Sequence, residues 1–332
     1  MTTNHAAIEV RDLVKRYAKA NVNAVDGVTF SVRPGEIFGL LGPNGAGKTT
    51  TIGVLITSVL PTSGAAAIMG LDVASDPIGI KQRIAVVPQQ SNLDRSLRVR
   101  EILTFHAAYH GVPHREREQR ADALLDELGL GDRKNDKVAR YSGGMSQRLM
   151  IARALMHAPD VLFLDEPTNN LDPQSRLFLW DRIRALNAQG LTILLTTHDM
   201  READQLCGRI AIMDKGRILV NDTSTELKKL IPGGNAVEVR VGLPAPETGG
   251  HVLEGLRGLE GVSKVDELDA GAPAANDEAG VVTYRLYAQN APALVGPATQ
   301  AVLVAGGQVR DLHVKQPSLE DVFIYLTGRH LR

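Results

Sequence analysis

The sequence predicts two domains, an α/β domain followed by a smaller α+β domain. The chain has 332 residues, which is long for one domain. Residues 8–230 mix short apolar runs with stretches of helical periodicity, as α/β domains do. Residues 231–235 read Ile-Pro-Gly-Gly-Asn, which is typical of a linker, and the pattern changes after them. We therefore expect domains at residues 1–230 and 235–332.

The strands of the first domain are expected to be short apolar runs buried on both faces of a sheet. They are residues 28–32, 36–41, 84–87, 161–164 and 192–196. A hairpin is expected over residues 209–221, because Asp214-Lys215-Gly216 separates two apolar segments there.

Two kinds of helical segment are expected in the first domain. One helix at residues 50–59 should follow the strand at residues 36–41 and stop before Pro61. Residues 99–110 and 115–128 carry apolar side chains at helical spacing, with Gly111-Val112-Pro113 between them. Together with a helix that begins near residue 142, they predict a helical subdomain over about residues 91–158.

The second domain shows the order βαββαβ, which is the ferredoxin-like pattern. The expected elements are strand 237–241, helix 252–259, strand 262–268, strand 281–287, helix 293–304 and strand 309–314. Residues 269–280 form a loop rich in Gly, Ala, Pro and Asp between the two halves, and residues 319–326 form a closing helix.

The composition of the chain indicates which partners and which cellular compartment to expect. The formal net charge is −1, so nucleic acid is not the expected partner. The single cysteine, Cys207, cannot form an intramolecular disulfide, and this favours a reducing compartment. No apolar run approaches the ~20 residues that cross a bilayer, and the start resembles no signal peptide. We expect a cytosolic protein, or one held at a membrane by another chain.

Residues 42–50 match the phosphate-binding loop pattern GxxxxGK[ST] and predict a nucleoside triphosphate as ligand. Glycines let successive backbone N–H groups turn toward a phosphate, and the following helix directs its N-terminus at the same anion. Lys48 would reach the β- and γ-phosphate oxygens, and the Thr49 hydroxyl would bind magnesium. The loop consists of Gly42, Pro43, Asn44, Gly45, Ala46, Gly47, Lys48, Thr49 and Thr50.

Polar residues end three of the expected strands. Asp165 and Glu166 follow an apolar run, and beside a phosphate loop we expect Asp165 to hold magnesium and Glu166 to polarise the attacking water. His198 follows another strand and could contact the γ-phosphate. Gln89 follows a third and could report on magnesium or water. Taken alone, each is compatible with an ordinary polar residue at a strand end.

A second anion site is predicted at the start of the helix near residue 142. Ser142, Gly143 and Gly144 would present bare N–H groups there. The alternative is that Ser142 only caps the helix and that the residues before it form a flexible loop. Two anion-binding helix starts in one chain suggest that two polypeptides share each nucleotide.

These motifs, in this order and approximate spacing, resemble the nucleotide-binding domains of ABC transporters. The resemblance rests on the phosphate loop, Gln89, Tyr141-Ser142-Gly143-Gly144, Asp165-Glu166, Asn170-Leu171-Asp172 and His198. It implies a RecA-like core with an antiparallel β subdomain and a helical subdomain, and two subunits that bury two ATP molecules head to tail. By this resemblance, Tyr17 stacks on adenine, Gln89 lies in the Q-loop, and Ser142–Gly144 form the signature that caps the partner's ATP. Glu166 is the catalytic carboxylate, Asp172 is the D-loop acid and His198 is the switch histidine.

Residues 317–329 also resemble the tail of the ABC-2 branch, the daunorubicin-resistance and nodulation-type exporters. That branch keeps its permease on a separate chain. The resemblance therefore implies an ATPase homodimer on the cytoplasmic side of the cell membrane, held there by the permease. We expect helical residues 91–140 to be the docking surface for the permease, because they adjoin Gln89, which could sense the γ-phosphate. The exported substrate would be a drug, a lipid or a glycan-like molecule.

Two alternatives remain at this point. Asn169-Asn170 resembles the ABC-F translation factors and would suggest a soluble ATPase that acts on the ribosome, although this chain carries one phosphate loop where those factors carry two nucleotide domains. An inactive regulatory subunit would require a damaged site, and none of the motifs is damaged.

Overall fold

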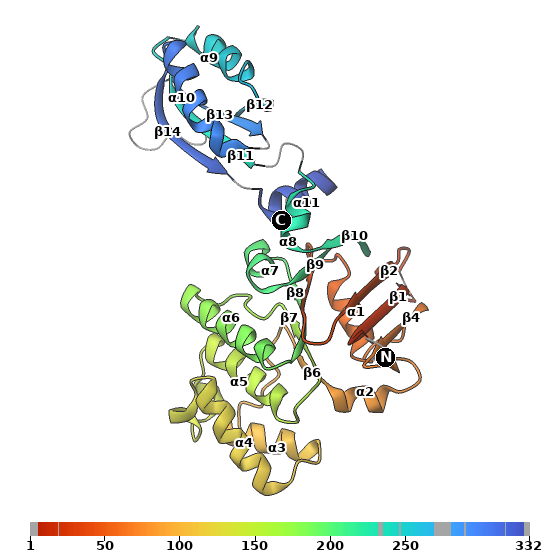
Figure 1. Ribbon diagram of the computed structural model, residues 1–332. Coiled ribbons are helices and arrows are strands. Elements are labelled where there is room, and N and C mark those ends of the chain that lie inside the picture. Colours follow the sequence, from red (N-terminus) through yellow and green to blue (C-terminus); the bar gives the residue numbers. More distant parts are fainter. Residues whose placement is uncertain are drawn as a thin grey trace, which may run out of the picture. The chain divides into compact units, whose positions relative to one another are not determined.

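The computed structural model describes residues 6–18, 20–231, 235–245, 247–268, 280–288, 290–315 and 317–328 (Figure 1). It divides into two compact units, the first extending to Ser224 and the second beginning at Thr225. Most of the expected linker, residues 232–234, and most of the expected loop, residues 269–279, lie outside the described residues.

A six-stranded sheet of order β10-β9-β3-β8-β7-β6 forms the centre of the first unit. Strands β9, β3, β8, β7 and β6 run parallel, and β10 closes the predicted hairpin with β9. Every residue of β3, β7 and β8 is buried, which is why these strands read as continuous apolar runs. The bounds are β3 (Ile37–Leu41), β6 (Ile84–Val87), β7 (Val161–Asp165), β8 (Thr192–Thr197), β9 (Arg209–Asp214) and β10 (Arg217–Asp222).

A second sheet in this unit is antiparallel, with the order β2-β1-β4-β5. Its buried residues, among them Val10 and Phe30, join one apolar core with the central sheet. The rings of Phe30 and Phe38 stack with centroids 5.1 Å apart, so the two sheets pack directly at this point. The bounds are β1 (Ile8–Lys15), β2 (Val25–Val32), β4 (Ser63–Ile68) and β5 (Leu71–Asp72).

The helices of the first unit include the predicted helical subdomain, where α3, α4 and α5 pack together. The helices are α1 (Lys48–Leu55), α2 (Pro77–Arg83), α3 (Val99–Tyr109), α4 (His114–Glu127), α5 (Gly143–Leu155), α6 (Pro173–Ala188) and α7 (Met200–Leu206), with short 3₁₀ turns η1 (Gly131–Arg133) and η2 (Val138–Arg140). A further short helix, α8 (Ser224–Lys228), lies where the two units divide.

Helix α1 is shorter than the sequence predicts and is shifted toward the N-terminus. It begins at Lys48 and ends at Leu55, whereas residues 50–59 were expected. Thr57 adopts a left-handed conformation with φ of 61°, and the N–H groups of Ser58 and Val59 both donate to the Gly53 carbonyl. The backbone therefore ends the helix itself, several residues before Pro61.

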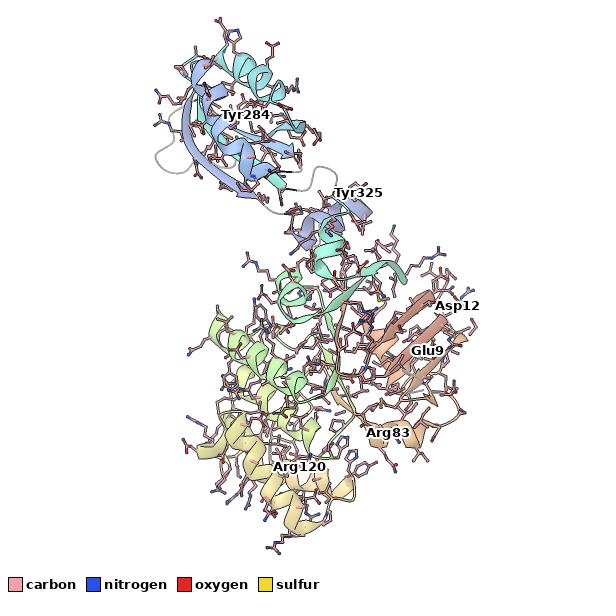
Figure 2. All side chains as sticks on the ribbon, viewed as in Figure 1. Glu9, Asp12, Arg83, Arg120, Tyr284 and Tyr325 are labelled. Atoms are coloured by element: carbon pink, nitrogen blue, oxygen red, sulfur yellow. The ribbon has the colours of Figure 1, made fainter. Side chains whose placement is uncertain are left out.

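The second unit contains an antiparallel sheet of order β12-β13-β11-β14. Its core joins Val239 and Leu286 of the sheet to Val252 and Val302 of the two helices. Tyr284 is 1% exposed in this core (Figure 2). The elements are β11 (Asn235–Gly242), α9 (Thr248–Arg257), β12 (Val262–Leu268), β13 (Val281–Ala288), η3 (Ala291–Leu294), α10 (Val295–Val304), β14 (Gln308–Lys315) and α11 (Leu319–Thr327). They confirm the predicted order of strands and helices.

Candidate active site

The predicted phosphate loop connects β3 to α1 at the carboxyl end of the parallel strands. Gly45 and Gly47 have φ of 80° and 104°, a conformation that side chains other than glycine rarely adopt. A Cβ atom at Gly47 would also lie 2.5 Å from the Ala24 carbonyl oxygen. Gly47 caps α1, and no side chain accepts from the first turn of that helix. The loop is therefore a backbone concavity in front of a helix N-terminus, the geometry that binds phosphate.

Lys48 lies at the base of this loop and is 4% exposed. Its Nζ donates to the carbonyl oxygens of Gly42 at 2.7 Å and Pro43 at 3.1 Å, and it lies 3.6 Å from Glu166 Oε1. Burial lowers the pKa of Lys48, while the carboxylates of Glu166 and Asp165 oppose that shift. A buried cation thus faces two acids beside the loop.

Glu166 follows β7 in a left-handed conformation with φ of 49°. Its N–H donates to the Thr196 carbonyl at 3.0 Å, which fixes the turn to the neighbouring strand β8. Its carboxylate accepts from Gln89 Nε2 at 2.9 Å and lies 3.2 Å from His198 Nδ1. The structure therefore brings Lys48, Gln89 and His198 together around one carboxylate.

Asp165 and Thr49 lie next to this cluster. Thr49 Oγ1 is 3.5 Å from Asp165 Oδ1, and Thr196 Oγ1 donates to the same carboxylate oxygen. Hydroxyl and carboxylate oxygens are ligands that Mg²⁺ prefers, so the donor set fits that ion. Gln89, the third predicted metal ligand, donates its amide to Glu166 in this structure.

The predicted signature lies elsewhere in the unit. Ser142 caps α5, where its Oγ accepts from Met145 N at 3.3 Å, and Ser142 and Gly143 are exposed. Helices α1 and α5 lie on opposite sides of strands β7 and β8 (Figure 1). Among the described residues, no hydrogen bond or ion pair joins residues 142–144 to the phosphate loop. One chain by itself does not bring its two anion-binding helix starts together.

Two further predicted residues are also apart from the Glu166 cluster. Asp172 caps α6, where it accepts from Ser175 N at 2.9 Å. Hydrogen bonds with the side chain and the backbone of Ser175 lower the pKa of Asp172. Tyr17 follows β1 and is 45% exposed, with Lys15 Nζ 5.2 Å from its ring centroid.

Sequence reasoning missed two residues that hold the acids in place. Asn169 Nδ2 donates to Glu166 Oε2 at 3.1 Å, and Thr196 Oγ1 accepts from Glu166 N at 3.2 Å. Strand β8 places Thr196 opposite Asp165 in the sheet register. The parallel order of β7 and β8 was the available signal, because residues at the same edge of neighbouring strands meet there.

Glu202 of α7 is a third residue that sequence reasoning missed. It is 1% exposed and accepts from Thr168 Oγ1 at 2.7 Å and Trp180 Nε1 at 3.2 Å. Burial raises the pKa of Glu202. It links the segment after Glu166 to helices α6 and α7.

Known proteins are similar to this sequence over nearly its whole length. Residues 25–169 match the ABC transporter family. The Nod factor export ATP-binding protein I of Burkholderia pseudomallei (strain 1710b) is 40% identical over 327 residues, which are 98% of this chain and 98% of that protein. The chain belongs to the ABC transporter ATP-binding proteins. Membership in this family confirms the resemblance inferred from the motifs and makes the protein a transport-coupled ATPase that binds ATP.

Other members of the family show similar agreement. The daunorubicin/doxorubicin resistance ATP-binding protein DrrA of Streptomyces peucetius is 38% identical over 322 residues, 97% of this chain and 92% of that one. The linearmycin resistance ATP-binding protein LnrL of Bacillus subtilis (strain 168) is 36% identical over 329 residues, 98% of this chain and 99% of that one.

Solved structures agree with the fold of the first unit. A structure of an ATP-binding subunit of an ABC transporter covers 68% of this chain and 92% of its own, with TM-score 0.62 and 34% identity. The dimeric structure of the ATP-binding cassette MJ0796 bound to ADP and Pi matches over 65% of this chain and 98% of the cassette, with TM-score 0.60 and 26% identity. None of the helices in the described part of our chain has the length and apolar character that a membrane crossing requires.

Proposed function

We propose that this chain is the ATP-hydrolysing subunit of an ABC-2 type exporter, in which two copies enclose two ATP molecules and power a separate membrane permease. The single observation that carries the catalytic part is the Glu166 carboxylate, held by Gln89 and His198 beside buried Lys48. The relatives described above are named for Nod factor export or for drug resistance. Their names favour an exported drug, lipid or glycan-like substrate over the alternative of a ribosome-associated ATPase.

In this proposal Glu166 orients and polarises the water that attacks the γ-phosphate. Lys48 neutralises phosphate charge, and residues 42–50 bind the phosphates through backbone N–H groups. His198 and Gln89 keep the carboxylate at the edge of the loop and respond to the γ-phosphate. Tyr17, which follows β1 and is exposed, would stack on adenine.

Magnesium would be held by Thr49 and Asp165, with Gln89 reaching it after leaving Glu166. Their oxygen atoms suit the ion, and when bound it would neutralise charge on the phosphate oxygens of ATP.

The dimer part of the proposal rests on the exposed helix start at Ser142. An N-terminus with bare N–H groups attracts phosphate, yet it is directed to solvent on the far side of β7 and β8 from α1. In a head-to-tail pair, the signature of one copy would cap the ATP on the loop of the other, with Asp172 nearby at the start of α6. The related cassette solved as a dimer with ADP and Pi supports the pairing of two copies.

The permease would dock on the helical subdomain and hold the ATPase on the cytoplasmic side of the membrane. Helix α3 exposes Phe105 (58%) and Tyr109 (87%), large apolar side chains suited to a protein partner. Crosslinks from residues 91–140 to a co-purified permease are the expected outcome. Their absence, with other regions crosslinking readily, would reject this docking surface.

The second domain, residues 235–332, is proposed to be a ferredoxin-like accessory domain that follows the ATPase domain of residues 1–230 in the sequence. Its βαββαβ order and the antiparallel order β12-β13-β11-β14 support that fold. The fold implies no ligand. Deleting residues 235–332 and measuring dimerisation, complex assembly and ATPase activity would separate a regulatory role from a structural one.

The substitution Glu166→Gln tests the catalytic assignment. It retains the size and hydrogen-bonding capacity of the side chain but removes the base, so turnover should fall on the order of 10²- to 10⁴-fold while ATP still binds. The matched control is Glu116→Gln on α4, whose side chain is 59% exposed and which should retain full activity. Unchanged ATPase activity in Glu166→Gln would falsify the assignment.

A further inference from the structure

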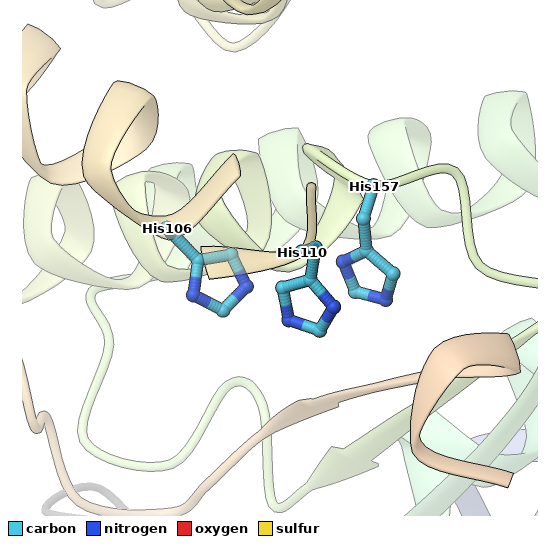
Figure 3. A group of neighbouring side chains, drawn as sticks. All are labelled: His106, His110 and His157. Carbon is cyan, nitrogen blue, oxygen red and sulfur yellow. The ribbon is translucent and has the colours of Figure 1, made fainter. Parts of the chain in front are cut away.

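Three histidines from two separate parts of the sequence converge in the helical subdomain. His106 and His110 lie one turn apart on α3 and at its C-terminal cap, and His157 follows α5. One nitrogen from each ring lies within 4.8 Å of the others, and this is the candidate metal-binding group found among the described residues (Figure 3). The rings of His110 and His157 stack with centroids 3.9 Å apart. None of these residues belongs to the ATP site described above.

The hydrogen bonding of His157 leaves one of its nitrogens available as a ligand. Its Nε2 lies 2.9 Å from the Ile84 carbonyl oxygen, which can only accept, so Nε2 carries the proton and Nδ1 carries the lone pair. Nδ1 is buried and has no hydrogen-bond partner among the described residues. Histidines that bind metals generally donate their other N–H to a carbonyl or carboxylate in this way.

The charge state of the cluster also suits a metal. Burial lowers the pKa of His106 to about 4, helped by the neighbouring His110, Arg153 and His157. Burial also lowers the pKa values of His110 and His157. The facing cations are Arg153, whose guanidinium donates to Asn92, and Arg120 on α4. Burial therefore disfavours the protonated form of all three imidazoles, and the neutral form is the one that coordinates metals.

We propose that His106, His110 and His157 bind a divalent transition-metal ion, with Zn²⁺ as the expected occupant and water as a fourth ligand. Three imidazoles and no carboxylate suit Zn²⁺ and neighbouring transition metals rather than Mg²⁺ or Ca²⁺. Zn–N bonds of about 2.0–2.1 Å place two tetrahedral ligands roughly 3.4 Å apart. The nitrogens, which lie within 4.8 Å of one another, must therefore approach by up to about 1.4 Å, and the stacked His110 ring must tilt toward the metal.

A metal at this position would join three elements that lead to the ATP site. It would tie α3 to the segment between α5 and β7, and through the His157 bond to Ile84 it would reach the first residue of β6. That strand leads directly to Gln89, which contacts Glu166. The bound ion would therefore stiffen the connection between the helical subdomain and the sheet.

Titration calorimetry of the full-length protein with ZnCl₂ tests the site. The protein should be purified without a polyhistidine tag, treated with chelator and measured without nucleotide. We expect one Zn²⁺ per chain, and Mg²⁺ should not compete. His157→Gln can still donate to the Ile84 carbonyl but lacks the Nδ1 ligand, so its Zn²⁺ affinity should fall by more than the 10- to 100-fold typical of outer-shell changes. The double variant His106→Ala/His110→Ala should lose the binding altogether.

The matched control is His114→Ala, an exposed histidine at the start of α4, which should retain the wild-type affinity. Melting temperatures measured without metal show whether each variant is folded, and Co²⁺ absorption spectra give a second readout of four-coordinate binding. Absence of saturable Zn²⁺ binding in the wild type overturns the proposal. So does binding that survives His157→Gln and the double variant, or binding lost in His198→Ala, which would place the ion at the ATP site.

Discussion

Replacing Gly47 with alanine should destabilise the ATPase unit much more than replacing Gly45. Both residues have positive φ, so a side chain at either costs about 1–2 kcal/mol of backbone strain. A Cβ atom at Gly45 meets nothing within 4 Å, whereas at Gly47 it would lie 2.5 Å from the Ala24 carbonyl oxygen and 3.3 Å from Gly216 Cα. Such overpacking adds about 1–3 kcal/mol, because the obstructing atoms are backbone.

The assay is urea unfolding followed by the fluorescence of Trp180, the single tryptophan of the chain. Trp180 lies in α6 and is 8% exposed, so its signal reports on the first unit. The free energy of unfolding should fall by about 1–2 kcal/mol in the Gly45→Ala variant and by about 2–5 kcal/mol in the Gly47→Ala variant. Equal losses in the two variants, or a Gly47→Ala protein as stable as the wild type, would refute the steric argument.

Two further changes test the packing around the acids. Thr196→Val removes a buried hydroxyl that accepts from Glu166 N and donates to Asp165. The free energy of unfolding should therefore fall by about 1–3 kcal/mol. A smaller loss than in an exposed threonine variant would count against this role. The raised pKa of Glu202 means that the native state holds a proton which the unfolded chain has lost, so stability should decrease as pH rises from the ordinary value of 4.5 through the folded pKa. Glu202→Gln should abolish that decrease in pH-dependent unfolding, and an unchanged pH profile would show that Glu202 is not its source.

The sequence predicts much of the site because the acting residues follow strands of one parallel sheet. Gln89, Glu166 and His198 each come after an apolar run, and the carboxyl ends of parallel strands meet at one edge. The phosphate loop and Lys48 end a fourth strand of the same sheet. Their convergence on Glu166 thus follows from strand order, which the motif spacing implies.

Other features depend on tertiary contacts that no local pattern reveals. Strand β4 contains the run Gly-Ala-Ala-Ala, whose β propensity is low, and it is a strand because it pairs with β1. Helix α1 ends early because Thr57 adopts a left-handed backbone conformation. The sequence carries no signal for that conformation, and the nearby Pro61 predicted a later end. No sequence pattern predicts the hydrogen bond from Asn169 to Glu166 or the one from His157 to Ile84, because these contacts form only when the chain has folded.

The most direct test of the account is the ATPase activity of a mixture of two inactive variants. Lys48→Ala disables the phosphate loop, and Ser142→Arg blocks the signature with a bulky cation. If each ATP is shared between copies, a mixed dimer pairs the intact loop of the Ser142→Arg chain with the intact signature of the Lys48→Ala chain. Random pairing makes half of the dimers mixed, each with one intact site of two, so we expect roughly a quarter of the wild-type activity. A mixture no more active than the two variants measured separately would contradict a site shared between chains.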